Sequence, residues 1–436
     1  MNRYTWIRAL RWVAALGVLA VVAACGGMGG SRGGSSDTLL VWVDGVRTPG
    51  VQQYKKAHKD SNIRVVTIPN KPGYILTKVS LANKSGDGWP DVVFLNSPSD
   101  ISSLASKKFH YATALNDLVP EETIDGFAPG ALPGCTFDDK VYCLRTDLGQ
   151  TMLWYNQDLM KKFGYEVPTS WKDYAAIGKR LVREHPGYVS GTIGGKWGAG
   201  TYFANSECRT RSAESLDIAH IDTSAKECTR VAKMLQPLVE KKTVRALTWS
   251  DPAFVKLAKQ GKVLMLPGPS WFGIHAFKDT YKTPKGQMAA APMPMWPDQD
   301  SPVAGTVGGG MWAVSKHASH AEQQAAADLI TWMTTDIGLQ KKQPTYPAYA
   351  KAAKAWCKSV ASSGYFASNP CPVMKQAAGR FTDSHDYVRY QPEWWNSYDA
   401  TFVSAAKSGD SLTDALQKWQ NRLVQAAKNA GYKVDT

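Results

Sequence analysis

Short apolar, β-rich runs alternate with segments of helical spacing from residue 38 onward, and this alternation constrains the fold more than any other feature of the sequence. The apolar runs lie at 38–44 (TLLVWVD), 62–68 (NIRVVTI) and 91–96 (DVVFLN), and the segments 49–59 and 74–84 between them have helical spacing. Continuous apolar strands connected by helices indicate a parallel sheet that is covered on both faces. We therefore expect an α/β fold that begins with a βαβαβ unit.

The carboxyl ends of these strands predict the first ligand contacts. In open α/β sheets, ligands bind outside the carboxyl ends of the strands. Asp44 follows the first apolar run, and Asn96 and Ser97 follow the third. We expect these three polar side chains to contact a ligand, with capping of the next helix as the alternative role of Asn96.

The rest of the chain continues with strands and helices and contains no internal repeat. A helix is predicted at 170–182, where Ser170 is a favourable N-cap. A Gly-rich loop holds Trp197 and Tyr202, and a strand that ends in a Gly/Pro turn presents Trp271. Further strands are expected at 151–156 and within 305–316, and further helices at 320–335, 394–407 and 411–430.

The composition is that of a globular protein and excludes several other classes. Of the 436 residues, 44% are apolar and 20% are charged, so the bulk of the chain is neither disordered, collagen-like nor a coiled coil. The length predicts two or three domains. The formal net charge is +14, and +11 without the three arginines of residues 1–24. Because the remainder contains no run of five like charges, we expect no nucleic-acid partner.

The N-terminus has the features of an export signal that ends at a cysteine. Residues 1–11 are basic, and residues 12–24 form an apolar stretch that is too short to span a bilayer as a helix. The small residues before Cys25 resemble a bacterial lipobox, in which the cysteine is diacylated. This resemblance implies a signal peptide at 1–24, and a lipidated Cys25 with a flexible tether over 25–36. An uncleaved anchor helix or a buried free cysteine is the alternative.

The other six cysteines form an even set, and export places them in an oxidising compartment where disulfides persist. A zinc site would need a spacing such as C-x₂-C, which is absent, and the nearby pair of His317 and His320 is more typical of a solvated surface. We therefore expect neither a metal nor another cofactor. Because the cysteines fall into three close pairs along the sequence, we predict three local disulfides, Cys135–Cys143, Cys208–Cys228 and Cys357–Cys371.

Three longer segments carry a family pattern. They are WPDVVF at 89–94, LWYNQDLMKKFGYEVPTSWKDY at 153–174, and GGGMWAVSKHASHAEQQAAADLITWMTT at 308–335. In this order they resemble the extracellular solute-binding proteins of carbohydrate ABC importers, the maltose-binding-protein class. The resemblance covers most of residues 37–436 and implies a two-lobe, periplasmic-binding-protein-like α/β fold with doubly wound sheets that are linked by a hinge.

The resemblance also implies how the chain is divided between the lobes. The N-terminal lobe would hold residues 37–146 and about 308–350, and the C-terminal lobe residues 147–307 and about 351–436. A sugar between the lobes offers hydroxyl groups to polar side chains and a C–H face to aromatic rings. Asp147 is a polar candidate, because it lies where the chain is expected to cross between the lobes.

Five aromatic residues are candidates for contact with the sugar. In the family a tryptophan after Gly-Pro stacks on the ligand, which implies this role for Trp271. Trp394 and Trp395 open a helix near a family aromatic, and since neighbours cannot both face the core of one helix, we expect one of them at the ligand. Trp197 and Tyr202 lie in a loop where the family has ligand-binding aromatics. For each of these rings, packing in the core is the alternative.

The resemblance implies a binding protein and not an enzyme. It would be a monomer that is held by its lipid at the outer face of the cell membrane, captures a carbohydrate and delivers it to ABC permease subunits. A non-sugar solute such as a glycerophosphodiester or a polyol is the alternative, and a secreted glycan-active enzyme or an adhesion protein are further ones. No P-loop and no G-x-G-x-x-G occurs, and Gly268–Gly273 is one residue too long for G-x-S-x-G.

Overall fold

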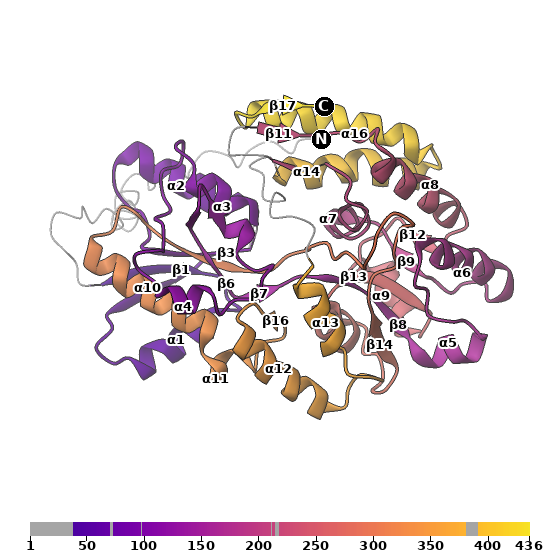
Figure 1. The fold of residues 1–436 in the computed structure, drawn as a ribbon, viewed down its shortest axis with the longest axis horizontal. Helices are drawn as coiled ribbons and strands as arrows, with labels where there is room; N and C mark the ends of the chain where they lie inside the picture. The colour runs from indigo at the N-terminus through magenta and orange to yellow at the C-terminus, as the bar shows by residue number, and fades with distance from the viewer. Residues whose placement is uncertain (1–37, 70–72, 97, 211, 214–217, 381–390) are drawn as a thin grey trace, which may run out of the picture.

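The computed structural model describes residues 38–69, 73–96, 98–210, 212–213, 218–380 and 391–436. Figure 1 shows two lobes, each with a sheet and surrounding helices, and the chain passes between them. The predicted signal peptide, Cys25, the tether and Ser97 lie outside the described residues. In the part of the chain that is described, no helix combines the length and the apolar character needed to cross a membrane.

The first lobe is organised around a sheet whose strands come from distant parts of the sequence. The strands are β1 (Leu39–Val43), β2 (Ile63–Thr67), β3 (Val92–Leu95), β6 (Leu144–Arg145) and β15 (Met311–Val314). Their order is β2-β1-β3-β15-β6, with β1 parallel to β2 and β3, and β15 antiparallel to β3 and β6. The parallel βαβαβ unit predicted from the first apolar runs is therefore confirmed.

Helices with clear sequence signals surround this sheet. They are α1 (Thr48–Ala57), α2 (Tyr74–Ser85), α3 (Pro98–Ala105), α4 (Glu121–Ile124), α10 (His320–Thr335) and α11 (Ile337–Gln340). α1 has Pro49 in its first turn, where the missing N–H has no helical partner to lose. α10 begins with a capping box, in which Ser319 and Glu322 each accept a hydrogen bond from the other's backbone N–H.

The second lobe contains a central antiparallel sheet and a small parallel pair. The strands are β8 (Thr151–Asn156), β13 (Met265–Pro269) and β14 (Met288–Ala291), with β9 (Gly191–Thr192) and β12 (Val244–Arg245) as the pair. β8 lies between β13 and β14 and is antiparallel to both, whereas β9 and β12 are parallel. A single bridge between Val189 and Val263 connects the two groups of strands.

The helices of the second lobe enclose an aromatic core. They are α5 (Gln157–Phe163), α6 (Trp171–Glu184), α7 (Gly195–Gly198), α8 (Lys226–Glu240), α9 (Pro252–Lys259), α14 (Gln391–Tyr398), α15 (Ser404–Ser408) and α16 (Leu412–Asn429). Ser170 caps α6 as predicted, since its Oγ accepts a hydrogen bond from the N–H of Asp173 at 3.1 Å. In Figure 1, α14 and α16 lie along the top of this lobe, and Trp171 and Trp419 are buried in its core.

Shorter elements complete the two lobes. Strands β4 (Thr136–Phe137) and β5 (Lys140–Val141) form a hairpin after the turn η1 (Pro133–Cys135). Strands β10 (Ser212–Ala213), β11 (Ile218–His220) and β17 (Lys433–Asp435) form a small sheet beside α16. The described residues also include the π-helical turns η2 (Ala199–Phe203), η3 (Phe272–Thr280) and η5 (Asp399–Val403). The last turn connects α14 to α15, so the predicted tail helices are both present.

Three extended segments lie side by side where the chain passes between the lobes. Residues 146–151 lie in the middle and are antiparallel to residues 305–310 through backbone hydrogen bonds. On the other side, β7 (Asp147–Leu148) is antiparallel to β16 (Tyr346–Pro347). The hinge region is therefore a narrow three-stranded ribbon.

Two helices after β16 lie beside this ribbon. α12 (Ala350–Ser363) packs against α11 and β16, and α13 (Cys371–Ala378) packs against β8 of the second lobe. The side-chain amide of Gln150, in the middle segment of the ribbon, donates to the carbonyl of Met374 at 3.1 Å. Figure 1 shows both helices below the crossing, where they contact elements of both lobes.

The three predicted disulfides are present. The pairs are Cys135–Cys143, Cys208–Cys228 and Cys357–Cys371, with sequence separations of 8, 20 and 14 residues. The first joins η1 to the strand that follows its hairpin, the second fixes the start of α8, and the third joins α12 to α13. Each therefore closes a short loop within one part of the fold.

Peptide mapping without reduction should recover these three pairs and no others. We expect Cys208→Ala with Cys228→Ala to lower the free energy of unfolding by about 2–4 kcal/mol, because the loop is no longer closed in the unfolded chain. Urea unfolding measures this change. Free thiols at two of the six positions in the exported protein would contradict the pairing.

Candidate functional site

Trp271 lies at the border of the second lobe, where β13 ends. The strand closes with Pro269, and η3 begins directly after the tryptophan. The side chain is 9% exposed, and its Nε1 donates a hydrogen bond to the carbonyl of Val307 at 2.9 Å. Because Val307 belongs to a crossing segment, the indole is held between the second lobe and the hinge.

Three aromatic rings pack edge-on against Trp271. The ring centroids of Trp197, Trp249 and Phe272 lie 5.0, 5.4 and 4.7 Å from it, with interplanar angles of 74°, 70° and 85°. Such contacts contribute about 0.5–1.5 kcal/mol each beyond the burial of the rings. The structure therefore brings two predicted residues, Trp197 and Trp271, together, and it adds Trp249, which no sequence motif indicated.

The glycine run after Val307 passes close to these rings. A Cβ on Gly308 would lie 3.5 Å from Nε1 of Trp271 and 4.0 Å from Cζ3 of Trp197. The φ angles of Gly308 and Gly309 are +87° and +96°, a conformation that favours glycine. The buried Arg145 donates from Nη2 to the carbonyl of Gly308 at 3.2 Å. The glycines thus allow the backbone to approach the aromatic cluster and the arginine closely.

The first lobe contributes a network of polar side chains at the carboxyl ends of its strands. Asp44 is 3% exposed, and its carboxylate accepts hydrogen bonds from Nη1 of Arg47 at 3.0 Å and from Nδ2 of Asn96 at 3.2 Å. The guanidinium of Arg47 lies over the ring of Phe94, 4.7 Å from its centroid. The structure therefore brings the two predicted residues Asp44 and Asn96 together, and Arg47 is an additional member of the network. The sequence could have indicated Arg47, because it lies only three residues after Asp44.

His275 lies close enough to charged groups of both lobes for them to affect its pKa. Its ring lies 6.2 Å from that of Trp271, in the first turn of η3. Burial lowers the pKa of His275; the nearby carboxylates of Asp279 and Asp147 raise it, and Arg47 lowers it further. Since Arg47 belongs to the first lobe and His275 to the second, the polar network and the aromatic cluster lie within electrostatic reach of each other.

Asp147 lies in the hinge ribbon and is 3% exposed. One carboxylate oxygen accepts a hydrogen bond from the backbone N–H of Gly310 at 2.9 Å. Its backbone pairs with Pro347 on the other side. The carboxylate therefore fixes the return segment of the hinge, next to the residues that surround Trp271.

Two of the predicted aromatic residues lie in the core of the second lobe. Tyr202 is 1% exposed, its hydroxyl lies 3.3 Å from that of Tyr174, and burial raises its pKa. Trp394 is also 1% exposed and donates from Nε1 to Oγ1 of Thr210 at 2.9 Å. Trp395 is only partly buried against this core. Tyr202 and Trp394 therefore pack in the core, which was the alternative stated for each ring, and they do not belong to the candidate site.

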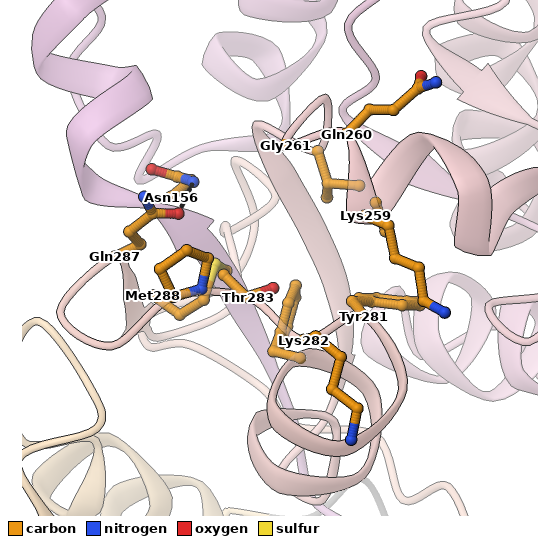
Figure 2. A pocket seen from close by; sticks show the side chains of 13 residues that line it. Asn156, Lys259, Gln260, Gly261, Tyr281, Lys282, Thr283, Gln287 and Met288 are labelled. Atoms are coloured by element: carbon orange, nitrogen blue, oxygen red, sulfur yellow. Dashed lines mark hydrogen bonds between the residues drawn. The ribbon is translucent and has the colours of Figure 1, made fainter.

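A cavity of about 260 Å³ lies at the other end of the second lobe's central sheet. Figure 2 shows Asn156 and Gln287 on one side of it and Tyr281 on the other, with Lys259 and Lys282 at its rim. The cavity lies at the end of β8 that is farther from the hinge, because Asn156 is the last residue of that strand. None of the residues predicted to bind the ligand lines it.

Comparisons with known proteins agree with this arrangement. Residues 43–339 match the family model of the bacterial extracellular solute-binding proteins. The chain is 25% identical over 321 residues to the arabinooligosaccharide-binding protein of Bacillus subtilis. This alignment covers 69% of this chain and 70% of that protein. It is 21% identical over 447 residues to the multiple sugar-binding protein of Streptococcus mutans, covering 94% and 98%.

Solved structures share the fold over nearly the whole chain. The lacto-N-biose complex of an ABC transporter binding protein from Bifidobacterium longum has a TM-score of 0.76 at 18% identity, covering 92% of this chain and all of that one. The complex of a Bifidobacterium animalis binding protein with β-1,6-galactobiose has a TM-score of 0.72 at 19% identity, with the same coverage. The two-lobe fold and the match of the family model lead to one conclusion: this chain belongs to the family of bacterial extracellular solute-binding proteins.

Proposed function

We propose that the protein captures a carbohydrate between its lobes and delivers it to the permease subunits of an ABC importer. Two observations support this proposal: the aromatic cluster around Trp271 adjoins the hinge, and Asp44 and Asn96 form a polar network at the carboxyl ends of the strands of the first lobe. An aromatic face suits the C–H face of a sugar, and carboxylate and amide groups suit its hydroxyl groups. The names of the two relatives, an arabinooligosaccharide-binding protein and a multiple sugar-binding protein, support the same class of ligand.

Trp271 would contribute ring surface and not a hydrogen bond. Its Nε1 is already used by the carbonyl of Val307, and three rings hold it edge-on. A ring that is fixed before the ligand arrives loses little conformational freedom on binding, which favours affinity. The hydrogen bonds to the sugar would then come mainly from the first lobe.

Closure of the two lobes would complete the site. The hinge ribbon is narrow, and each group of ligand-binding residues lies on one side of it. A ligand that contacts both groups binds the closed state better and shifts the population toward it. The aromatic cluster of the second lobe and the polar network of the first would each hold one side of the sugar.

The charge arrangement favours a neutral sugar over a phosphodiester. The guanidinium of Arg47 is paired with Asp44 at 3.0 Å, so its charge is largely compensated within the network. An anionic solute would have to compete with this buried carboxylate for the arginine. A glycerophosphodiester is therefore the less suitable ligand, although a polyol remains compatible with the same groups.

The buried carboxylates of Asp44 and Asp147 accept hydrogen bonds from other groups of the protein, which supports binding without turnover. A glycosidase needs two carboxyl groups about 5–10 Å apart that face the scissile bond. Asp44 is occupied by Arg47 and Asn96, and Asp147 by the backbone of Gly310. Among the residues that the structure describes, no group of three His, Cys, Asp or Glu side chains could hold a metal ion. We infer that the solute is delivered unchanged by a monomer that is lipidated at Cys25.

Replacement of Trp271 by alanine should weaken sugar binding by about 30- to 1000-fold, which corresponds to roughly 2–4 kcal/mol for a desolvated aromatic anchor. A thermal-shift screen of neutral di- and oligosaccharides first identifies a bound sugar. Isothermal titration of Trp271→Ala with that sugar then measures the loss.

Trp419→Ala is the matched control for this experiment. Trp419 is fully buried in the core of the second lobe, and its replacement should cost about 3–5 kcal/mol of stability, as a buried tryptophan does. Both variants are expected to melt earlier, but only Trp271→Ala should lose affinity when titrated well below its melting temperature. Equal affinities of the two variants would assign Trp271 to the core alone.

The bound sugar should be recovered chemically unaltered. Prolonged incubation with the protein followed by mass spectrometry measures this, because hydrolysis would add one water per bond cleaved. The proposal of a binding protein predicts no product above a protein-free control. Product that increases in proportion to protein concentration would show an enzyme instead.

The protein should lose its membrane attachment when Cys25 is replaced by alanine. The acyl chains are the proposed anchor, and no described helix could substitute for them. Fractionation of cells that express each form measures the change, with the variant expected in the soluble or extracellular fraction. A Cys25→Ala protein that stays with the membrane as an integral component would contradict the lipid anchor.

A further inference from the structure

A cluster of basic and aromatic side chains lies at the end of the first sheet that is farther from the second lobe. Trp89 precedes β3 and His317 follows β15, and their rings are stacked with centroids 3.9 Å apart and an interplanar angle of 10°. The ring of His110 lies 6.2 Å from that of His317. Nζ of Lys316 lies 2.9 Å from Nδ1 of His110. Three basic groups are therefore in mutual contact on one surface.

Within the described part of the chain, these basic groups are not paired with carboxylates. Among the described residues, none of Lys316, His110 and His317 forms an ion pair with an acidic side chain. Burial lowers the pKa of Lys316. Burial also lowers the pKa of His317; a hydrogen bond with His110 raises it, and the electrostatic effects of His110 and Lys316 lower it further. An anion placed beside these groups would favour their charged forms.

Apolar and further basic side chains surround the cluster. Leu81 on α2 is 53% exposed, an unusual value for leucine, and Lys84 lies one turn after it. Nε1 of Trp89 donates to Asn83 of the same helix at 2.7 Å. The exposed residues 107–108, both lysine, follow α3, which packs beside α2. An exposed leucine and a partly exposed tryptophan among lysines are typical of surfaces that rest on a membrane interface.

The chain enters the folded part of the molecule at this same end. β1 begins at Leu39, and the N–H of Leu40 donates to the carboxylate of Asp91, two residues after Trp89. β3 and β15 are the next strands of the sheet, so the cluster lies about 10 Å from the start of β1. Residues 26–36 read GGMGGSRGGSS, and a flexible Gly-rich chain of this length has an average end-to-end distance of about 20 Å. Lipidation at Cys25 would therefore hold this end nearest to the bilayer.

We propose that this surface binds the anionic headgroups of phospholipids and holds the tethered protein upright, with its second lobe directed away from the membrane. We call it the basal patch; it consists of Leu81, Lys84, Trp89, Lys107, Lys108, His110, Lys316 and His317. The lysines and histidines contact headgroup phosphates, and Leu81 and Trp89 contact the interfacial region. The orientation rests on the proposed anchor at Cys25, whereas the affinity for anionic lipid is a property of the patch alone.

The test uses the chain from residue 25 onward with Cys25→Ser, so that no acyl chain contributes. Co-sedimentation compares vesicles of phosphatidylglycerol mixed with phosphatidylcholine against vesicles of phosphatidylcholine alone. We expect binding to the anionic vesicles only. Each lysine of the patch that is removed should weaken it by about fivefold. Lys107→Gln with Lys108→Gln is the first variant, because both side chains are exposed and contribute nothing to the core.

The matched control is Lys161→Gln with Lys162→Gln, an exposed lysine pair on α5 of the second lobe. It removes the same net charge and should leave vesicle binding nearly unchanged. Equal losses in both variants would show a non-specific effect of net charge and overturn the patch. Leu81→Asp should also weaken binding, and a melting temperature near that of the parent protein excludes unfolding as the cause.

Two further measurements complete the test. Vesicle binding should weaken as the salt concentration rises, because the contacts of the lysines with headgroup phosphates are electrostatic and are screened by salt. Binding of inorganic phosphate by the patch without any binding to anionic vesicles would overturn the membrane assignment. If the Cys25→Ala protein leaves the cell membrane while the patch still binds vesicles, the anchor and the patch are separate, and both proposals hold.

Discussion

The pairing of two crossing segments, 146–151 and 305–310, is the constraint on which the rest of the structure depends. Backbone hydrogen bonds of 2.8–2.9 Å join Val307 to Gly149, and Thr146 to Gly310. A Cβ on Gly149 would collide with the carbonyl of Val307, so the close approach requires glycine there. This one pairing sets how the two sheets are joined and which residues of each lobe can meet.

The same segments also hold the candidate site in place. Val307 accepts the hydrogen bond of Trp271, Gly308 accepts that of Arg145, and Gly310 donates to Asp147. The aromatic cluster is therefore attached directly to the hinge. A change in hinge geometry would move the carbonyl that holds the indole, so ligand contact and lobe closure share one structural element.

Sequence reasoning found the parts of the site that follow from periodicity and strand ends. Asp44 and Asn96 could be placed together, because parallel strands bring their carboxyl ends to one edge of a sheet. Of the neighbours Trp394 and Trp395, the first is in the core and the second is only partly buried, as expected for adjacent positions of one helix. The buried role of Tyr202 could not be predicted, because it depends on Tyr174 of a distant helix.

Residues that join the site only through tertiary contacts were also missed. Trp249 packs against Trp271 although it lies more than twenty residues before it in the sequence. Arg47, which belongs to the other lobe, lowers the pKa of His275. Residue spacing in the sequence does not predict such tertiary contacts, since they depend on how β13, η3 and the hinge are packed. The local disulfides, by contrast, were predictable, because each joins cysteines that are neighbours along the chain.

The two ends of the first sheet differ in how their charges are compensated, and this difference separates two kinds of recognition. At the carboxyl ends of the parallel strands, Asp44 compensates Arg47 and accepts from Asn96, which leaves a neutral network suited to hydroxyl groups. At the opposite end, Lys316 and two histidines are in contact and form no ion pair with a carboxylate among the described residues, which suits an anionic surface. The amino ends and the carboxyl ends of parallel strands lie at opposite edges of the sheet, so the length of the strands separates the polar network from the basic cluster. A neutral solute and a charged membrane surface therefore need not compete for the same groups.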